Sequence, residues 1–156
     1  MDSSRGRVLN PAPFCLIGIV NVTPDSFSDG GKYIDPCNAV AHGLRLLDEG
    51  AGMLDLGAES TRPFAEPVPE GEEIARLMPV VARLREQRPD AVLSVDTLKA
   101  GTARAALEGG ADIINDVSAC VADPALLDVL AEYKPGYVLM HSQGSPREMQ
   151  VNPRLR

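Results

Sequence analysis

Leu16-Ile-Gly-Ile-Val-Asn-Val-Thr-Pro-Asp-Ser-Phe-Ser-Asp-Gly-Gly-Lys32 passes within a few residues from an apolar run to a polar loop. The continuous apolar run at its start is typical of a strand covered on both faces. Asn21 ends that run, and the loop after it is dense in hydroxyl and carboxylate groups, with Pro24 and Gly30-Gly31 as turn residues. The stretch predicts a site-forming loop at the end of a buried strand, although taken alone it also fits a strand followed by an ordinary polar turn.

The rest of the chain repeats this change from an apolar strand to a polar end. Apolar runs predict strands near residues 53–56, 91–95, 113–114 and 137–140, and helical periodicity lies between them within 35–50, 70–88, 100–110 and 123–130. Pro79 is expected to kink the second helix. Such alternation indicates a parallel sheet, either a closed barrel or an open doubly wound sheet. Because no glycine-rich phosphate fingerprint follows a strand, the pattern favours an α/β fold of the TIM-type (β/α) barrel, incomplete here with about five of its eight strands.

Composition is that of an ordinary globular protein. The chain has 156 residues, 44% hydrophobic and 24% charged, which suits one domain over residues 1–156. Its formal net charge of -7 argues against a broad surface for nucleic acid or anionic membranes. No apolar run approaches the roughly 20 residues that span a bilayer, and no secretory signal is visible. Three cysteines without metal-like spacing indicate reduced thiols, so we expect a cytoplasmic protein.

Two polar residues at strand ends are candidates for ligand recognition. In a (β/α) barrel the carboxyl ends of the strands face one mouth, where residues far apart in sequence converge. Asp96 directly follows apolar Val95, and a carboxylate at the edge of a core needs hydrogen-bond donors, such as two adjacent N–H groups of a ligand. Asn115 offers a donor and an acceptor to the same flat heterocycle. The structural alternatives are that Asp96 caps the helix that follows it and that Asn115 fixes a loop by hydrogen bonds.

Other residues at the same mouth suit anions and a metal ion. Arg62 lies in a loop with Ser60 and Thr61, and a guanidinium beside hydroxyl groups suits phosphate or carboxylate. A solvated surface arginine is the alternative. Asn21 supplies one neutral oxygen, which can hold Mg²⁺ when phosphate oxygens and waters complete the octahedron. His141, at a strand end, contacts either a ligand or the backbone.

At these residues the sequence strongly resembles the dihydropteroate synthase family. The matching motifs, in the family's order, are Gly18–Gly31, Glu59–Pro63, Ser94–Thr97, Ile113–Asp116 and Leu139–His141. The resemblance covers nearly the whole chain from Phe14 onward, and the first two motifs are specific to this family. It implies a (β/α) barrel enzyme, a transferase of folate biosynthesis. That enzyme joins 6-hydroxymethyl-7,8-dihydropterin diphosphate to p-aminobenzoate, giving dihydropteroate and pyrophosphate.

By position, the resemblance implies a role for each matching residue. Asp96 and Asn115 correspond to the pair that recognises the pterin, and Met140 to a residue that lines its pocket. Asn21 corresponds to the contact with Mg²⁺ and diphosphate. The loops that close over diphosphate and p-aminobenzoate correspond to Phe27, Ser28, Asp29, Thr61, Arg62 and Pro63. Of these, Asp29, Thr61 and Arg62 are the expected catalytic residues.

The chain departs from the family pattern in two respects. Ala58 stands where the family usually has a second glycine, and Phe64 where glycine is common, so we expect an altered p-aminobenzoate pocket. The chain also ends at Arg156, before the family's further aspartate, lysine and Arg-x-His motif, and so resembles a C-terminally truncated domain. We therefore expect no turnover by the isolated chain.

The resemblance implies small-molecule substrates as partners, and a homodimer of the intact protein stays open. Two alternatives to a synthase remain at this point. One is a pterin-dependent methyltransferase of the same superfamily, which shares the motifs around Asp96 and Asn115 but lacks the opening loop and the loop around Arg62. The other is an inactive pterin-binding fragment.

Overall fold

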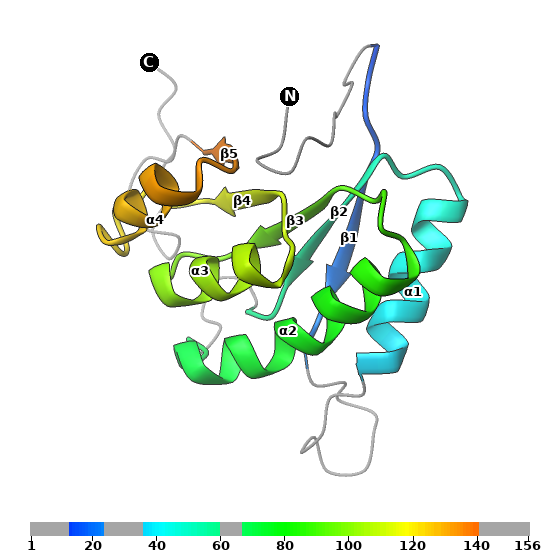
Figure 1. Ribbon diagram of the computed structural model, residues 1–156, viewed down its shortest axis with the longest axis horizontal. Coiled ribbons are helices and arrows are strands. Elements are labelled where there is room, and N and C mark those ends of the chain that lie inside the picture. Colours follow the sequence, from blue (N-terminus) through cyan, green and yellow to red (C-terminus); the bar gives the residue numbers. More distant parts are fainter. Residues whose placement is uncertain (1–12, 24–35, 60–66, 141–156) are drawn as a thin grey trace, which may run out of the picture.

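A computed structural model of the chain describes residues 13–23, 36–59 and 67–140. Strands and helices alternate along these residues (Figure 1): β1 Ile17–Asn21, α1 Pro36–Asp48, β2 Met53–Gly57, α2 Glu70–Gln87, β3 Leu93–Asp96, α3 Ala100–Gly109, β4 Ile113–Asp116, α4 Leu126–Tyr133 and β5 Gly136–Leu139. Every strand pairs in parallel with the next one in chain order, giving the sheet order β1-β2-β3-β4-β5. This is the architecture of a partial TIM-type barrel, as the alternating pattern predicts.

The last helix and strand differ slightly from the sequence-based bounds. The α4 helix begins at Leu126 instead of Pro124. The reason is Asp123, whose Oδ1 accepts a hydrogen bond from the Ala125 N–H at 3.1 Å while its Oδ2 accepts one from the Ala100 N–H at 2.8 Å. Asp123 therefore joins the turn before α4 to the start of α3. The β5 strand begins and ends one residue earlier than expected.

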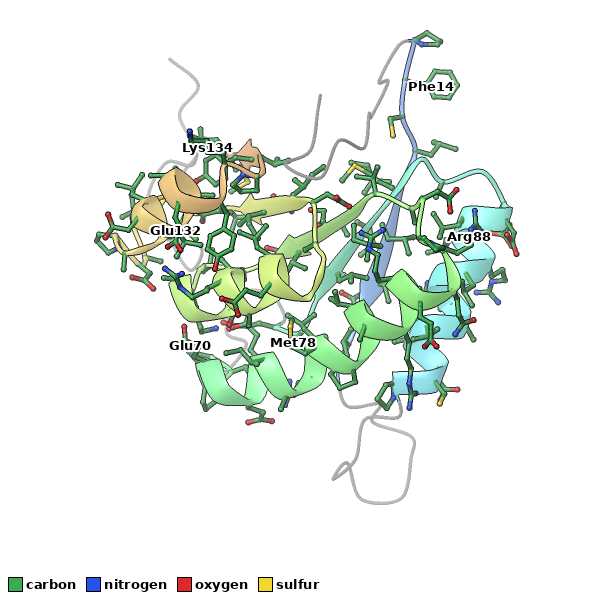
Figure 2. All side chains as sticks on the ribbon, viewed as in Figure 1. Phe14, Glu70, Met78, Arg88, Glu132 and Lys134 are labelled. Carbon is green, nitrogen blue, oxygen red and sulfur yellow. The ribbon has the colours of Figure 1, made fainter. Side chains whose placement is uncertain are left out.

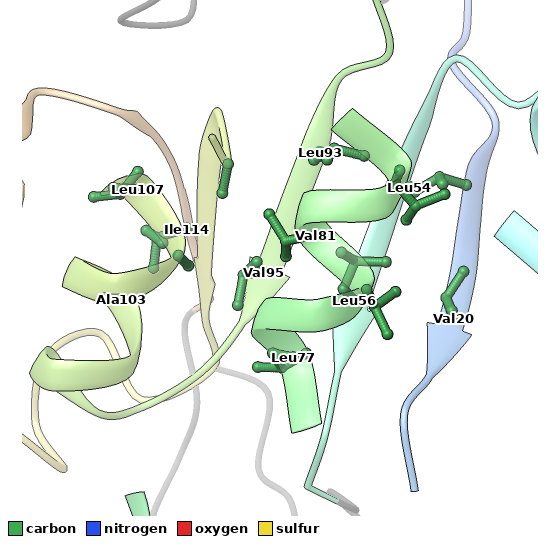
Figure 3. Close-up of a cluster of buried hydrophobic side chains, with 14 of the residues drawn as sticks. Val20, Leu54, Leu56, Leu77, Val81, Leu93, Val95, Ala103, Leu107 and Ile114 are labelled. Carbon is green, nitrogen blue, oxygen red and sulfur yellow. The ribbon is translucent and has the colours of Figure 1, made fainter. Parts of the chain in front are cut away.

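The helices cover one face of the sheet and form the main core with it. Side chains of this face are fully or almost fully buried, and Figure 3 shows them packed against α2 and α3: Val20, Leu54, Leu56, Leu93, Val95 and Ile114 from the strands, with Leu77, Val81, Ala103 and Leu107 from the helices. Pro79 lies inside α2 and is exposed, and the kink expected there stays a prediction. The apolar stripe of α2 faces the strands, as its helical spacing predicts.

The opposite face of the sheet corrects the expectation that the first strand is covered on both sides. Successive side chains of a strand point to opposite faces. Val20 of β1 is buried by the helices, whereas Ile17 and Ile19 are 52% and 53% exposed. Phe14, just before β1, is 72% exposed and projects away from the other elements (Figure 2). Among the described residues, the helices lie on one side of the sheet only, because right-handed crossovers all return over the same face.

We call the uncovered face the inner face. Strand alternation and pairing place on it Ile17, Ile19, Asn21, Met53, Asp55, Gly57, Ser94, Asp96, Ile113, Asn115, Gly136 and Val138. Its amino end is apolar, with Met53, Val92 and Ile113 packed into a small cluster. Its carboxyl end is polar. The described part of the chain has no helix that is long and apolar enough to cross a membrane.

A buried ion pair closes the amino end of the sheet. The Arg85 guanidinium donates to Asp112 Oδ2 at 2.9 Å, and the Asp112 side chain is fully buried. The same guanidinium donates to the carbonyl oxygens of Ala91 and Gly110, both at 2.7 Å, while Asp112 also accepts from the Leu93 N–H. These bonds join the end of α2 to the starts of β3 and β4, at the opposite end of the sheet from the polar residues.

Candidate active site

Four residues from adjacent strands form one row at the carboxyl end of the inner face. Asn21 is in register with Gly57, Gly57 with Asp96, and Asp96 with Asn115. Asn21 is exposed, and Asp96 and Asn115 are half-buried. Gly57 adds no side chain to the row, and a Cβ at this position would lie in ordinary van der Waals contact with the Asp96 side chain, 3.7 Å from its Cβ. The structure therefore brings together the described strand-end residues that the sequence selects.

A second polar layer lies one step deeper, and sequence reasoning missed it. Asp55 Oδ2 accepts a hydrogen bond from Asn115 Nδ2 at 3.0 Å, although β3 lies between their two strands. Ser94 of β3 is in register with Asp55. Asp55 Oδ1 and Ser94 Oγ are buried, and neither has a hydrogen-bond partner among the described residues. Asp55 interrupts the apolar run 53–56, and this interruption is the feature of the sequence that could have indicated the second layer.

The electrostatics of the site centre on Asp96. Burial is the largest cause of a raised pKa at Asp96, and the negative charges of Asp55, Glu73, Asp116 and Glu59 add to it in that order; together they bring the pKa to about 7. A carboxyl group with such a pKa changes its charge near neutral pH. Asp96 can therefore accept hydrogen bonds from a ligand as a carboxylate, or donate one as an acid.

The structure rules against a helix-cap role for Asp96. The residue before α3 is Lys99, and no side chain caps the helix there. The N–H groups at the start of α3 bond elsewhere: that of Ala100 to Asp123 at 2.8 Å, and that of Gly101 to Glu70 Oε1 at 2.8 Å. The Asn115 amide likewise bonds a strand residue rather than a loop. Both side chains are thus available to the inner face.

Asp116 fixes the turn that follows β4. Its Oδ1 accepts hydrogen bonds from the N–H and the hydroxyl of Ser118, both at 2.7 Å, and its Oδ2 accepts from the Cys120 N–H at 2.6 Å and the Tyr137 hydroxyl at 2.9 Å. Burial alone favours a raised pKa for Asp116, but these donors outweigh it and lower the pKa. Ala119 and Cys120 both adopt left-handed backbone conformations in this turn, which the four donors to Asp116 hold in place.

Lys99 holds the start of the loop that follows β2. Its ammonium contacts Glu59 Oε2 at 2.5 Å and Glu73 Oε2 at 2.7 Å, and Thr102 donates to the same Glu73 oxygen at 3.1 Å. Burial works to lower the pKa of Lys99, but the hydrogen bonds to both glutamates raise it overall. Arg76 donates to the Ala58 carbonyl oxygen at 3.0 Å. Glu73 lies in the first turn of α2, and nothing in the local sequence pattern indicates that it belongs to this buried network.

The remaining candidates divide into two groups. Phe27, Ser28, Asp29, Thr61, Arg62, Pro63, Phe64 and His141 lie outside the described residues. Met140 is described: it follows β5, is partly buried, and donates its N–H to the Asp116 carbonyl oxygen at 3.5 Å. Strand alternation places it on the same face as Val138, which is in register with Asn115.

The described residues offer no self-contained metal cage, because no group of three or more His, Cys, Asp or Glu side chains is arranged to hold an ion. The exposed amide of Asn21, next to Gly57, fits only a cation whose other ligands are substrate oxygens and water. Mg²⁺ binds in this way, since it keeps several waters and prefers phosphate oxygens.

Comparison with known proteins assigns the chain to a family. Residues 17–156 match the family model described as pterin binding enzyme. The chain belongs to this family. A curated relative named dihydropteroate synthase, from Mycobacterium leprae, is 50% identical over 130 residues, which are 83% of this chain and 45% of the relative. A second, from Bacillus subtilis, is 47% identical over 128 residues, which are 82% of this chain and 45% of that protein.

Solved structures of the family agree with the fold. A dihydropteroate synthase from Xanthomonas albilineans with 4-aminobenzoic acid is 51% identical and has a TM-score of 0.81, covering 90% of this chain and 51% of that one. The Yersinia pestis enzyme in complex with a sulfonamide drug is 42% identical with a TM-score of 0.85, covering 99% of this chain and 55% of that one. The chain thus spans about half the length of the relatives it matches.

Proposed function

We propose that the full-length protein is a dihydropteroate synthase, which condenses 6-hydroxymethyl-7,8-dihydropterin diphosphate with p-aminobenzoate. The observation that carries the proposal is the register pair of Asp96 and Asn115 on the inner face, in a family whose named relatives are dihydropteroate synthases. Another structure of the Xanthomonas albilineans enzyme is in complex with 7,8-dihydropteroate, the product of that reaction.

In this proposal Asp96 and Asn115 recognise the pterin. A pterin presents adjacent N–H donors and ring acceptors on one edge. The Asp96 carboxylate suits the donors, and the Asn115 amide supplies both kinds of partner. Met140 lies on the same face and gives an apolar contact to the flat ring. Because the site is half-buried, these bonds are stronger than in water.

The chemistry is mainly electrostatic. The amino nitrogen of p-aminobenzoate forms a bond to the pterin methylene as the bond from that carbon to the diphosphate breaks. Cationic and hydrogen-bonding groups stabilise the negative charge that develops on the departing diphosphate. Arg62 and Thr61 supply them in the proposal, with Asn21 facing the same oxygens. Mg²⁺, when bound, neutralises the departing diphosphate.

The rest of the proposed site belongs to two loops, the one that follows β1 and the one that follows β2. Asp29 acts in catalysis, and Phe27, Ser28 and Pro63 enclose p-aminobenzoate and keep water from the electrophilic methylene. A cytoplasmic location and a homodimer of the intact protein complete the proposal.

An assay of the full-length protein tests this function. We expect release of pyrophosphate and formation of dihydropteroate, both dependent on p-aminobenzoate. Methyl transfer from a methylated pterin, without release of pyrophosphate, would instead identify the methyltransferase alternative. Pterin binding without either reaction would identify a binding protein.

Arg62→Ala tests the division of roles within the site. We expect turnover to fall more than pterin affinity, because the guanidinium acts on the diphosphate and not on the heterocycle. Arg45→Ala is a matched control, since Arg45 is an exposed arginine of α1. Normal turnover of Arg62→Ala would remove Arg62 from the mechanism.

The isolated 156-residue chain gives a further test. We expect it to form no measurable dihydropteroate, because the family's later cationic residues are absent from it. Turnover near that of an intact synthase, by a preparation shown by mass spectrometry to end at Arg156, would contradict this expectation.

A further inference from the structure

We propose that Asp55 is a positioning residue for the pterin site: it holds the Asn115 side-chain amide in one of its two flip orientations and so sets the hydrogen-bonding pattern that Asn115 and Asp96 present together. The inference rests on the proposed function, because it assigns the residue beneath the pair that meets the pterin. Asp55 itself lies one step deeper than that pair and is not proposed to contact the ligand.

The first step is the path of the Asp55 to Asn115 hydrogen bond. It joins β2 to β4 across the full width of β3, at 3.0 Å between Asn115 Nδ2 and Asp55 Oδ2. A large side chain on β3 at this level would block the contact. The residue there is Ser94, in register with Asp55, and its small side chain lets the two groups meet.

The second step is the chemistry of the two groups. An ionised carboxylate only accepts hydrogen bonds, whereas an amide has a donating end and an accepting end. Only the NH₂ end of Asn115 can therefore face Asp55, and the amide oxygen is directed elsewhere. Without a charged partner the two flip orientations of an amide differ little in energy, and a ligand would meet a mixture of them.

The third step is the influence of Asp55 on Asp96. Burial is the largest cause of the raised pKa of Asp96, and the negative charge of Asp55 is the second largest. The same carboxylate thus acts on both members of the proposed pterin pair, through a hydrogen bond to Asn115 and through its charge on Asp96.

A purely structural role accounts poorly for Asp55. Its Oδ1 is buried without a hydrogen-bond partner among the described residues, and an unsatisfied buried acceptor destabilises the folded state. An apolar side chain at position 55 would pack on this face, as that of the neighbouring Met53 does, and it would leave no buried acceptor without a partner. The carboxylate therefore has a function other than holding the sheet together.

Ligand binding by the full-length protein tests the proposal, with 6-hydroxymethylpterin as the probe. Asp55→Asn keeps the size of the side chain but accepts either orientation of Asn115, and we expect the dissociation constant to rise about ten-fold or more. Asp55→Glu restores the charge and should recover part of the affinity. Asp48→Asn is the matched control, because it makes the same substitution at an exposed carboxylate of α1, and its dissociation constant should stay within about three-fold.

A spectroscopic measurement supports this test and needs no ligand. The NH₂ signals of Asn115 are assigned by their loss in Asn115→Asp. In the unaltered protein we expect coupling across the hydrogen bond from one of these protons to the Asp55 carboxyl carbon. Because it uses the unaltered protein, this measurement remains decisive if Asp55→Asn does not fold.

Two results would overturn the proposal. One is the absence of that coupling in the unaltered protein. The other is a folded Asp55→Asn variant that binds the pterin as tightly as the Asp48→Asn control. If the unaltered protein binds no pterin at all, the proposed function is wrong, and the positioning role proposed for Asp55 is wrong with it. Coupling detected in that case would show the contact alone.

Discussion

The two faces of the sheet are built from the same strands and differ in almost every physical property. The helix-covered face is apolar and buried, with Leu54, Leu56 and Val95 inaccessible to solvent. The inner face has exposed isoleucines at β1 and a polar carboxyl end, where one carboxylate oxygen of Asp55 is buried without a hydrogen-bond partner in the described part of the chain. The comparison teaches that stability and ligand recognition are assigned to alternate residues of a strand, so that neighbours such as Asp55 and Leu56 have separate roles.

The largest expected effect is on the covered face. Leu56→Ala should lower the free energy of unfolding of the 156-residue chain by about 2–5 kcal/mol, because it leaves a cavity between β2 and α2. Ile19→Ala, on the exposed inner face, should change it by less than about 0.5 kcal/mol. Urea unfolding measures both. An equally large loss for Ile19→Ala would show that the inner face is covered in solution, for example by self-association, which sedimentation would detect.

A change on the inner face should show the opposite pattern. In the full-length protein, Asp96→Asn should weaken pterin binding by roughly 1–3 kcal/mol, because a charge-assisted hydrogen bond is lost. It should not destabilise the fold, since the raised pKa of Asp96 means that its charge is unfavourable where it lies. Calorimetric titration and thermal unfolding separate the two effects. Asp48→Asn, an exposed carboxylate of α1, is the control, and unchanged pterin affinity in Asp96→Asn would remove Asp96 from the site.

The last expected effect is on the pH dependence of stability. The pKa of folded Asp96, about 7, lies above its ordinary value of 3.8, so the folded state takes up a proton in that interval and stability rises as the pH falls through it. The pKa of Asp116 is lowered, so its contribution is present above 3.8 and is lost as the pH falls through the lowered pKa. Urea unfolding from pH 8 to 3 should therefore show greatest stability in weakly acidic solution. The gain between pH 7 and 4 should be absent in Asp96→Asn.

Local patterns in the sequence were sufficient to predict most of the fold. Apolar runs and helical periodicity depend on residues a few positions apart, and they gave the order of the elements and the convergence of Asp96 with Asn115. The exposure of Ile17 and Ile19 was not predictable in this way. A run of apolar residues looks the same whether one face of the strand or both are covered.

The deeper layer of the site depends on contacts that no local pattern records. Asp55 and Asn115 are 60 residues apart and meet across an intervening strand. Lys99 joins Glu59 to Glu73 in a similar way, 40 and 26 residues away. Their individual positions suggest other roles: an aspartate in a strand, and glutamates beside a loop and in a helix's first turn. Only the packing of the elements brings these charges together.

The sheet order also has a consequence for the way the chain folds. Each strand pairs with the strand made just before it, so every crossover closes a short loop, and the entropy cost of each closure is modest. During synthesis a new strand and its helix can join the edge of units already formed, without waiting for distant parts of the chain. This segment can therefore assemble progressively from its amino end. A sheet whose first and last strands must pair early cannot assemble in this way.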